Sequence, residues 1–113
     1  MLDMNQHFNI LITDAVHHYF IDEMKQFGCD VNYVPEITRA EVLQSIHEYD
    51  VLLINSRINA NRELLEKGTK LKAVARIGSG LEVMDTDFAS QKNIQCFNAP
   101  EGNKDAVAEH ALA

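Results

Sequence analysis

The sequence predicts an α/β domain built on a parallel sheet of five strands with helices on both faces. Strand-like and helix-like segments alternate strictly along the 113 residues, and the connections between them are short. The run Val51–Ile54 is apolar without interruption, which is typical of a central parallel strand that is buried on both faces. No repeat, low-complexity tract or linker divides the chain.

The first strand is expected at Phe8–Thr13, a short apolar and β-branched run. Asp14 is a plausible N-cap for the following helix, and Gly28 stands where a glycine ends a helix. Cys29–Val34 reads as the second strand, which Pro35 ends. The apolar stripe of the intervening helix is formed by Val16, Tyr19, Phe20, Met24 and Phe27.

The next helix begins at Thr38, because Thr38 and Glu41 match the capping box. It is followed by the third strand, Val51–Ile54, and by a helix that Asn61 can cap and Gly68 can end. The residues expected to face inward from these two helices are Val42, Leu43, Ile46, Leu64 and Leu65.

The fourth strand is expected at Ala73–Ala75, with Arg76 at its end, and the fifth at Ile94–Asn98. Asp85 or Thr86 caps the helix between them, whose inward residues are Phe88 and Ala89. A further helix is expected from Asn103, with Val107, Ala111 and Leu112 on one side. Five strands connected in this way fit the flavodoxin-like, doubly wound order 2-1-3-4-5.

A loop of two glycines around one small residue, Gly78-Ser79-Gly80, follows the fourth strand. Backbone N–H groups can converge on an anion there, because no Cβ obstructs them at the glycines. Ligands of open α/β sheets bind just beyond the carboxyl ends of the strands, where this loop lies. The loop is therefore either an anion site or merely a tight turn.

The formal net charge is −7, from 17 acidic and 10 basic residues. An acidic surface repels phosphate backbones and anionic membranes, so we expect neither nucleic acid nor membrane as a partner. The two cysteines, Cys29 and Cys96, are far apart, which favours a reducing, cytoplasmic environment without disulfides. The N-terminus lacks the features of a signal peptide.

Two motifs resemble the D-isomer-specific 2-hydroxyacid dehydrogenases, the family of phosphoglycerate dehydrogenase and glyoxylate reductase. The first runs from Leu71 to Gly80 and continues through Met84-Asp85; the second runs from Asn98 to Asn103 and ends with Val107–His110. The first 70 residues match only in their strand–helix pattern. The resemblance implies a substrate-binding (catalytic) domain at 1–102 and the start of a truncated interdomain hinge helix at 103–113.

The resemblance also implies roles for single residues. Backbone groups of Gly78, Ser79 and Gly80 would hold the substrate carboxylate, and Arg57 would hold a substrate phosphate or be an ordinary solvated arginine. Ser79, Asn103 and Val107 would line the cofactor, and Arg76 would anchor the loop. Asn55 stands where phosphoglycerate enzymes commonly have a second arginine, and Leu81-Glu82 replaces the usual apolar-Asp pair. No catalytic residue and no metal ligand is expected in this chain, and none of its five histidines is given a catalytic role.

The function that the resemblance implies is an oxidoreductase acting on the CH–OH group of 2-hydroxy acids, with D-3-phosphoglycerate dehydrogenase among the candidates. Its cofactor would be NAD, with NADP left open, bound mainly by a domain with a G-x-G-x-x-G fingerprint that this sequence lacks. A small 2-hydroxy or 2-keto acid would be the substrate, the whole protein would be a homodimer, and residues 1–113 alone would be inactive. The alternative is a non-catalytic module that binds small anions or proteins. A phospho-receiver domain fits poorly, because strand one is followed by only one acidic residue, Asp14, while strand three ends in Ile54-Asn55 and strand five in Phe97-Asn98, without the aspartate and lysine of such a site.

Overall fold

Five parallel strands form one sheet in the order β2-β1-β3-β4-β5, as the sequence predicts. The computed structural model describes residues 8–78 and 83–99. The expected helix from Asn103 and the domain boundary at 102 lie outside these residues. The strands are β1 (Asn9–Ile12), β2 (Asp30–Tyr33), β3 (Val51–Ile54), β4 (Ala73–Ile77) and β5 (Gln95–Ala99).

The central strand β3 has no exposed residue, as its unbroken apolar run predicts. Leu52 and Ile54 pack into one hydrophobic cluster, while Val51 and Leu53 pack into a second cluster on the opposite face. This division follows from the alternation of side chains along a strand. The predicted and observed bounds of β3 are identical, and those of the other four strands differ by one or two residues at an end.

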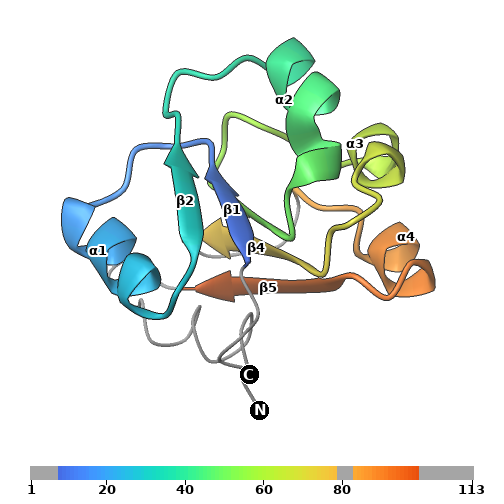
Figure 1. The fold of residues 1–113 in the computed structure, drawn as a ribbon. Helices are drawn as coiled ribbons and strands as arrows, with labels where there is room; N and C mark the ends of the chain where they lie inside the picture. The colour runs from blue at the N-terminus through green and yellow to red at the C-terminus, as the bar shows by residue number, and fades with distance from the viewer. Residues whose placement is uncertain (1–7, 79–82, 100–113) are drawn as a thin grey trace.

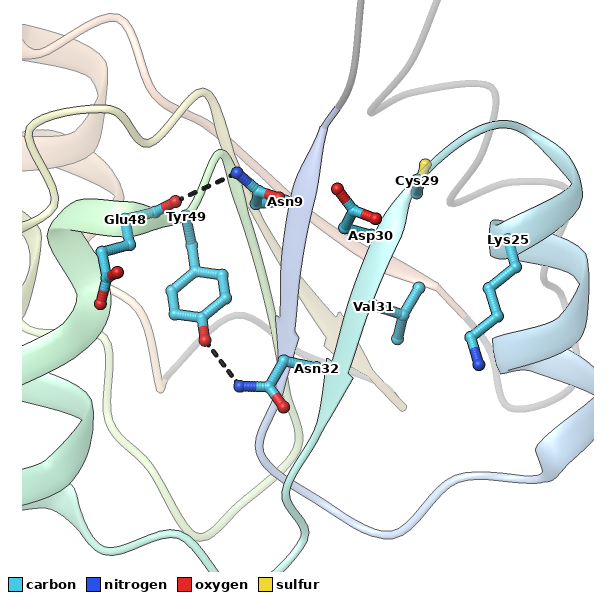
Figure 2. Close-up of a pocket in the computed structure, with 8 residues that line it drawn as sticks. All are labelled: Asn9, Lys25, Cys29, Asp30, Val31, Asn32, Glu48 and Tyr49. Carbon is cyan, nitrogen blue, oxygen red and sulfur yellow. Dashed lines mark hydrogen bonds between the residues drawn. The ribbon is translucent and has the colours of Figure 1, made fainter.

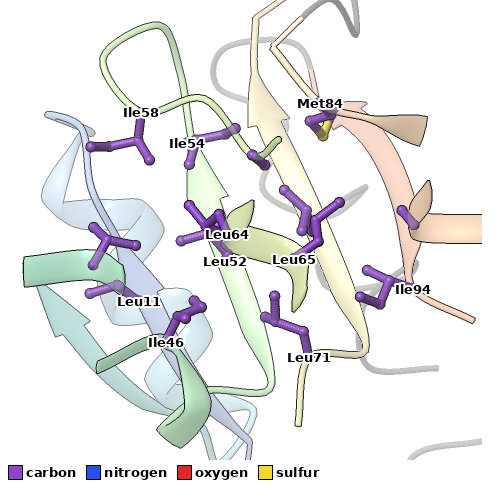
Figure 3. Close-up of a cluster of buried hydrophobic side chains, with 14 of the residues drawn as sticks. Leu11, Ile46, Leu52, Ile54, Ile58, Leu64, Leu65, Leu71, Met84 and Ile94 are labelled. Carbon is purple, nitrogen blue, oxygen red and sulfur yellow. The ribbon is translucent and has the colours of Figure 1, made fainter. Parts of the chain in front are cut away.

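The helices are divided unequally between the two faces of the sheet (Figure 1). They are α1 (His18–Gln26), α2 (Arg39–Ser45), α3 (Arg62–Lys67) and α4 (Thr86–Gln91), with a 3₁₀ turn η1 (Ile46–Glu48) after α2. Helix α1 lies on one side, and α2, α3 and α4 lie on the other. Figure 3 shows the cluster beneath these three helices, where Leu64 and Leu65 of α3 meet Leu52 of β3.

Three of the predicted N-caps are confirmed. The capping box of α2 is complete: the Glu41 N–H donates to Thr38 Oγ1 at 3.2 Å, and the Thr38 N–H donates to Glu41 Oε1 at 3.0 Å. The hydrogen bond from the Thr38 backbone is the main reason that the pKa of Glu41 is lowered. Asn61 caps α3 and Asp85, rather than Thr86, caps α4.

Helix α1 departs from the prediction. It begins at His18, and its cap is His17, whose Nδ1 accepts from the Tyr19 N–H at 3.3 Å; Asp14 does not cap it. Phe20 and Met24 are buried as expected, but Tyr19 and Phe27 are 54% and 43% exposed. Neighbouring helical residues point about 100° apart, so Tyr19 and Phe20 cannot both face the sheet.

Asp50 lies at the amino end of β3 and is 5% exposed. Its Oδ2 accepts from the Asn9 N–H at 2.8 Å, and Lys72 Nζ lies 4.0 Å from its Oδ1. The backbones of Asp50 and Asn9 are joined as well, because the Asp50 N–H donates to the Asn9 carbonyl at 2.8 Å. The carboxylate thus fixes the start of β1 against the start of β3.

We therefore predict that Asp50→Ala lowers the free energy of unfolding by about 1–3 kcal/mol, because it leaves the partly buried Asn9 N–H without its acceptor. Asp50→Asn, which keeps an acceptor, should cost less. Denaturant titration of the purified variants measures both. Replacing the exposed carboxylate of Asp22 by Ala should change stability by less than about 0.5 kcal/mol, and an equal loss at Asp22 and Asp50 would contradict the role of Asp50.

Candidate functional site

The carboxyl ends of the five parallel strands meet at one edge of the sheet, where open α/β sheets bind their ligands. The residues that the structure describes at this edge are Thr13 and Asp14 after β1, Asn55 and Arg57 after β3, Gly78 after β4 and Asn98 near the end of β5. Of the site residues predicted from the sequence, Arg57 and Gly78 are among them. Ser79, Gly80, Asn103 and Val107 lie outside the described residues, as do Leu81 and Glu82.

Asp14 is part of this edge instead of a helix cap. Its side chain is only 6% exposed, and its Oδ2 accepts two hydrogen bonds, from Thr13 Oγ1 at 3.0 Å and from the Asn55 N–H at 2.8 Å. The carboxylate therefore bridges the ends of β1 and β3, which is the switch point of this strand order. The sequence signal that could have revealed this role of Asp14 is the Thr-Asp pair directly after the first strand. That strand pairs with β3, which is buried on both faces.

Arg57 connects three loops through backbone carbonyl groups. Its Nη1 donates to the carbonyl of Thr13 at 3.3 Å, and Nη1 and Nη2 donate to the carbonyl of Ile37 at 3.0 and 2.7 Å. The residue is nevertheless exposed. The guanidinium is thus held in place at the carboxyl edge while part of it faces solvent, an arrangement compatible with either predicted role.

Gly78 adopts a backbone conformation that L-residues rarely reach, with φ +127°. A Cβ built on it would lie 3.5 Å from Asn55 Oδ1, so the asparagine side chain faces the glycine. From the other neighbouring strand, Asn98 Nδ2 donates to the Gly78 carbonyl at 3.2 Å. Arg76 Nε donates to the Asn55 carbonyl at 3.2 Å, so Arg76 anchors the loop after β3.

Two hollows lined by described residues lie away from this edge. The first, of about 510 Å³, lies along the edge strand β2 (Figure 2). Lys25 of α1 lies to one side of β2 and Tyr49 to the other, where its hydroxyl accepts from Asn32 Nδ2 at 2.7 Å. The second, of about 550 Å³, lies between α4 and the start of β5. Both are open depressions, and neither includes Arg57 or Gly78.

The two cysteines are poor nucleophiles. Burial, with a smaller contribution from the charge of Asp30, raises the pKa of the Cys29 thiol to about 11. Burial and then the charge of Asp85 raise the pKa of Cys96 as well. Both side chains are therefore protonated thiols at neutral pH.

Within residues 8–78 and 83–99 no group of three or more His, Cys, Asp or Glu side chains could hold a metal ion. Of the three histidines there, His17 caps α1, His18 is the first residue of α1 and His47 lies in η1. No helix in the same part of the chain has the length and apolar character needed to cross a bilayer.

The fold and the edge described above define an α/β domain of the kind that binds a ligand beyond its strand ends. Comparison with known proteins identifies which kind. Residues 10–113 match the family model described as D-isomer specific 2-hydroxyacid dehydrogenase, catalytic domain, and the chain belongs to this family. The resemblance seen in the two sequence motifs is thereby confirmed.

Two of the curated relatives that the chain matches bear the same name. The chain is 33% identical over 104 residues to D-3-phosphoglycerate dehydrogenase of Synechocystis sp., and 35% identical over 100 residues to that of Methanocaldococcus jannaschii. These alignments cover 92% and 88% of the chain. The chain spans about a fifth of the length of these relatives, 19% in both cases.

Solved structures share the fold. An NAD⁺-bound 3-phosphoglycerate dehydrogenase of Entamoeba histolytica superimposes with a TM-score of 0.73 at 20% identity, over 93% of this chain and 37% of that one. The apo-structure of D-lactate dehydrogenase from Escherichia coli gives 0.70 at 18% identity, over 95% and 35%. At such identities the likeness concerns the fold.

The backbone at Gly78 generates a stability prediction. Gly78→Ala should lower the free energy of unfolding by about 1–3 kcal/mol, because a residue with a Cβ is strained at φ +127°; the Cβ itself would make only an ordinary contact, at 3.5 Å, with Asn55 Oδ1. Gly28 is the matched control: it also has a positive φ, +87°, but a Cβ there would meet nothing within 4 Å. Gly28→Ala should cost less in the same denaturant titration, because a φ of +87° lies nearer than +127° to the left-handed region that L-residues can reach, and equal losses would contradict this ranking.

Proposed function

We propose that this chain is the substrate-binding domain of an NAD-dependent D-2-hydroxyacid dehydrogenase. The observation that carries the proposal is the match to the catalytic-domain family model over residues 10–113. The relatives named D-3-phosphoglycerate dehydrogenase support the same activity, and they make D-3-phosphoglycerate the first substrate to test. Asn55 is a reason to test unphosphorylated 2-hydroxy acids beside it, because a carboxamide carries no charge to bind phosphate.

The carboxylate of the substrate would bind at the turn that begins with Gly78. The absence of a Cβ there leaves the backbone accessible between Asn55 and Asn98, and neither of these two carboxamide side chains carries a formal negative charge. Arg57 would add a positive charge on the side of β3. Its guanidinium is already oriented by the carbonyl groups of Thr13 and Ile37, so less side-chain entropy is lost when it binds an anion.

NAD, when bound, would accept a hydride from the carbon that carries the substrate hydroxyl. Ser79, Asn103 and Val107 are our candidates for the contact of this chain with the cofactor. The sequence has no G-x-G-x-x-G fingerprint, so we assign most of the cofactor site, and the general acid/base, to another part of the whole protein. With this division, the domain would form one wall of a cleft between two domains. We expect the whole protein to be a homodimer and to reside in the cytoplasm.

The test is an activity comparison between the whole protein and residues 1–113. The whole protein should oxidise NADH with glyoxylate, hydroxypyruvate or phosphohydroxypyruvate, and NADPH should be tried in parallel. Residues 1–113 should give no measurable turnover, because hydride transfer needs the cofactor fixed against the substrate carbon. Absorbance at the nicotinamide band measures both. An inactive whole protein across all these keto acids would favour the non-catalytic binding module, and turnover by residues 1–113 would refute the division of the site.

Substitution of Arg57 tests its predicted contact. In the whole enzyme Arg57→Ala should raise the KM for a phosphorylated keto acid roughly tenfold more than the KM for an unphosphorylated one, a difference of about 1.4 kcal/mol. The kcat should change little, since a phosphate remote from the reacting carbon is bound alike in the ground and transition states. Steady-state kinetics with the two substrates measure the difference.

Arg39→Ala is the matched control for Arg57→Ala. Arg39 also donates to a backbone carbonyl, that of Asn59 at 2.7 Å, and to Asn61 Oδ1 at 2.6 Å, but it connects α2 with the start of α3. Its loss should lower stability without a substrate-selective change in KM. Equal changes of KM for both substrates in Arg57→Ala would mean that Arg57 is only a structural connection.

A further inference from the structure

Thr13 and Asp14, the two residues that follow β1, bind the first and last residues of the segment Asn55–Arg57. At one end the Asn55 N–H donates to Asp14 Oδ2 at 2.8 Å. At the other end Arg57 Nη1 donates to the carbonyl of Thr13 at 3.3 Å. Thr13 and Asp14 are 0% and 6% exposed, so two buried residues hold a segment of which Ser56 and Arg57 are exposed.

The Asp14 carboxylate is itself held by the hydroxyl group of the preceding residue, Thr13. Thr13 Oγ1 donates to Asp14 Oδ2 at 3.0 Å and lies 3.4 Å from the carbonyl oxygen of Leu53. One carboxylate oxygen thus accepts a hydroxyl and a backbone N–H together. Hydrogen bonds to an ionised acceptor are roughly twice as strong as those between neutral groups. The carboxylate is therefore suited to hold Asn55 in one place.

Asn55 connects the Asp14 carboxylate with the turn that begins at Gly78. Its N–H is bound by Asp14 and its carbonyl by Arg76 Nε, at 2.8 and 3.2 Å, so both backbone polar groups of the residue have partners. The remaining polar group, the carboxamide, has its Oδ1 facing Gly78. Movement of the Asn55 backbone would shift one side of the Gly78 turn and the Arg57 guanidinium together.

We propose that Asp14 is a positioning residue for substrate binding. Its buried carboxylate holds the Asn55–Arg57 segment in the conformation that sets both Arg57 and the β3 side of the Gly78 turn against the anionic substrate. The inference rests on the proposed function and adds to it a residue that touches neither substrate nor cofactor. Loss of this support should weaken substrate binding beyond what a loss of stability explains.

Asp50 provides a matched control at the opposite edge of the sheet. It is 5% exposed, against 6% for Asp14, and it too accepts a backbone N–H at 2.8 Å across the β1–β3 pair. The two aspartates are thus alike in burial and in hydrogen bonding to the backbone. They differ in that Asp14 lies at the carboxyl ends of the strands and Asp50 at the amino ends.

The experiment compares Asp14→Ala with Asp50→Ala, and Asp14→Asn with Asp50→Asn, in the whole enzyme, with the thermal unfolding midpoint measured for each. The keto acid is the one that the wild type turns over best. Asp14→Ala should raise its KM about tenfold and Asp14→Asn about threefold, because misplacement of binding groups weakens their contacts. The KM for NADH should stay within about twofold of wild type in both. The Asp50 variants should lose stability with both KM values unchanged.

If the alanine variants do not fold, the asparagine pair decides. Asp14 variants with a lowered midpoint and an unchanged KM for the keto acid overturn the inference, as does an equal rise of that KM in the Asp50 variants. A wild-type enzyme without turnover on any keto acid removes the proposed function and the inference with it. The two failures are therefore distinguishable.

Discussion

At each end of the β1–β3 strand pair, a buried aspartate holds the two strands together. At the amino edge Asp50 accepts from the Asn9 N–H, and at the carboxyl edge Asp14 accepts from the Asn55 N–H. Where paired strands diverge into loops, backbone N–H groups lose their ladder partners and need another acceptor. A carboxylate satisfies that need, and it helps to hold β1 and β3 in register at the switch point of the sheet.

The sheet order and most helix boundaries were predictable because they depend on local patterns. The apolar run of β3, the capping box at Thr38 and the caps at Asn61 and Asp85 each depend on residues within a few positions of one another. Helix α1 was predicted less well, because it begins at His18 and ends at Gln26, so Val16 and Phe27 of the predicted stripe lie outside it. Burial of Phe20 and Met24 leaves Tyr19 exposed, and nothing local says which of two neighbouring aromatic residues faces the sheet.

The carboxyl edge was only partly predictable, for the same reason. Gly78 stands out in the sequence, and its φ of +127° is a conformation for which glycine is suited. The partners of Asp14 and Arg57 do not stand out, since Asp14 meets Asn55 across 41 residues and Arg57 meets Thr13 across 44. Asp14 satisfies a local rule for a helix cap, yet the contact across the β1–β3 pair is the one it makes. A rule based on neighbouring residues cannot take account of the Asn55 N–H, a donor that the fold brings to Asp14 from 41 positions away.

The charge distribution bears on the anionic substrate that we propose for this edge. The chain carries a net charge of −7, so such a substrate would be repelled at long range and would have to be attracted locally. The guanidinium groups of Arg39 and Arg62 lie beside the carboxylates of Glu63 and Glu66, at 3.3 and 2.8 Å, which compensate their charges. Among the described residues Arg57 donates only to carbonyl oxygens, which orient a guanidinium without cancelling its charge. Of these three arginines, only the one at the carboxyl edge has no carboxylate within 4 Å among residues 8–78 and 83–99, so within this part of the chain its charge is the most available to attract an anion.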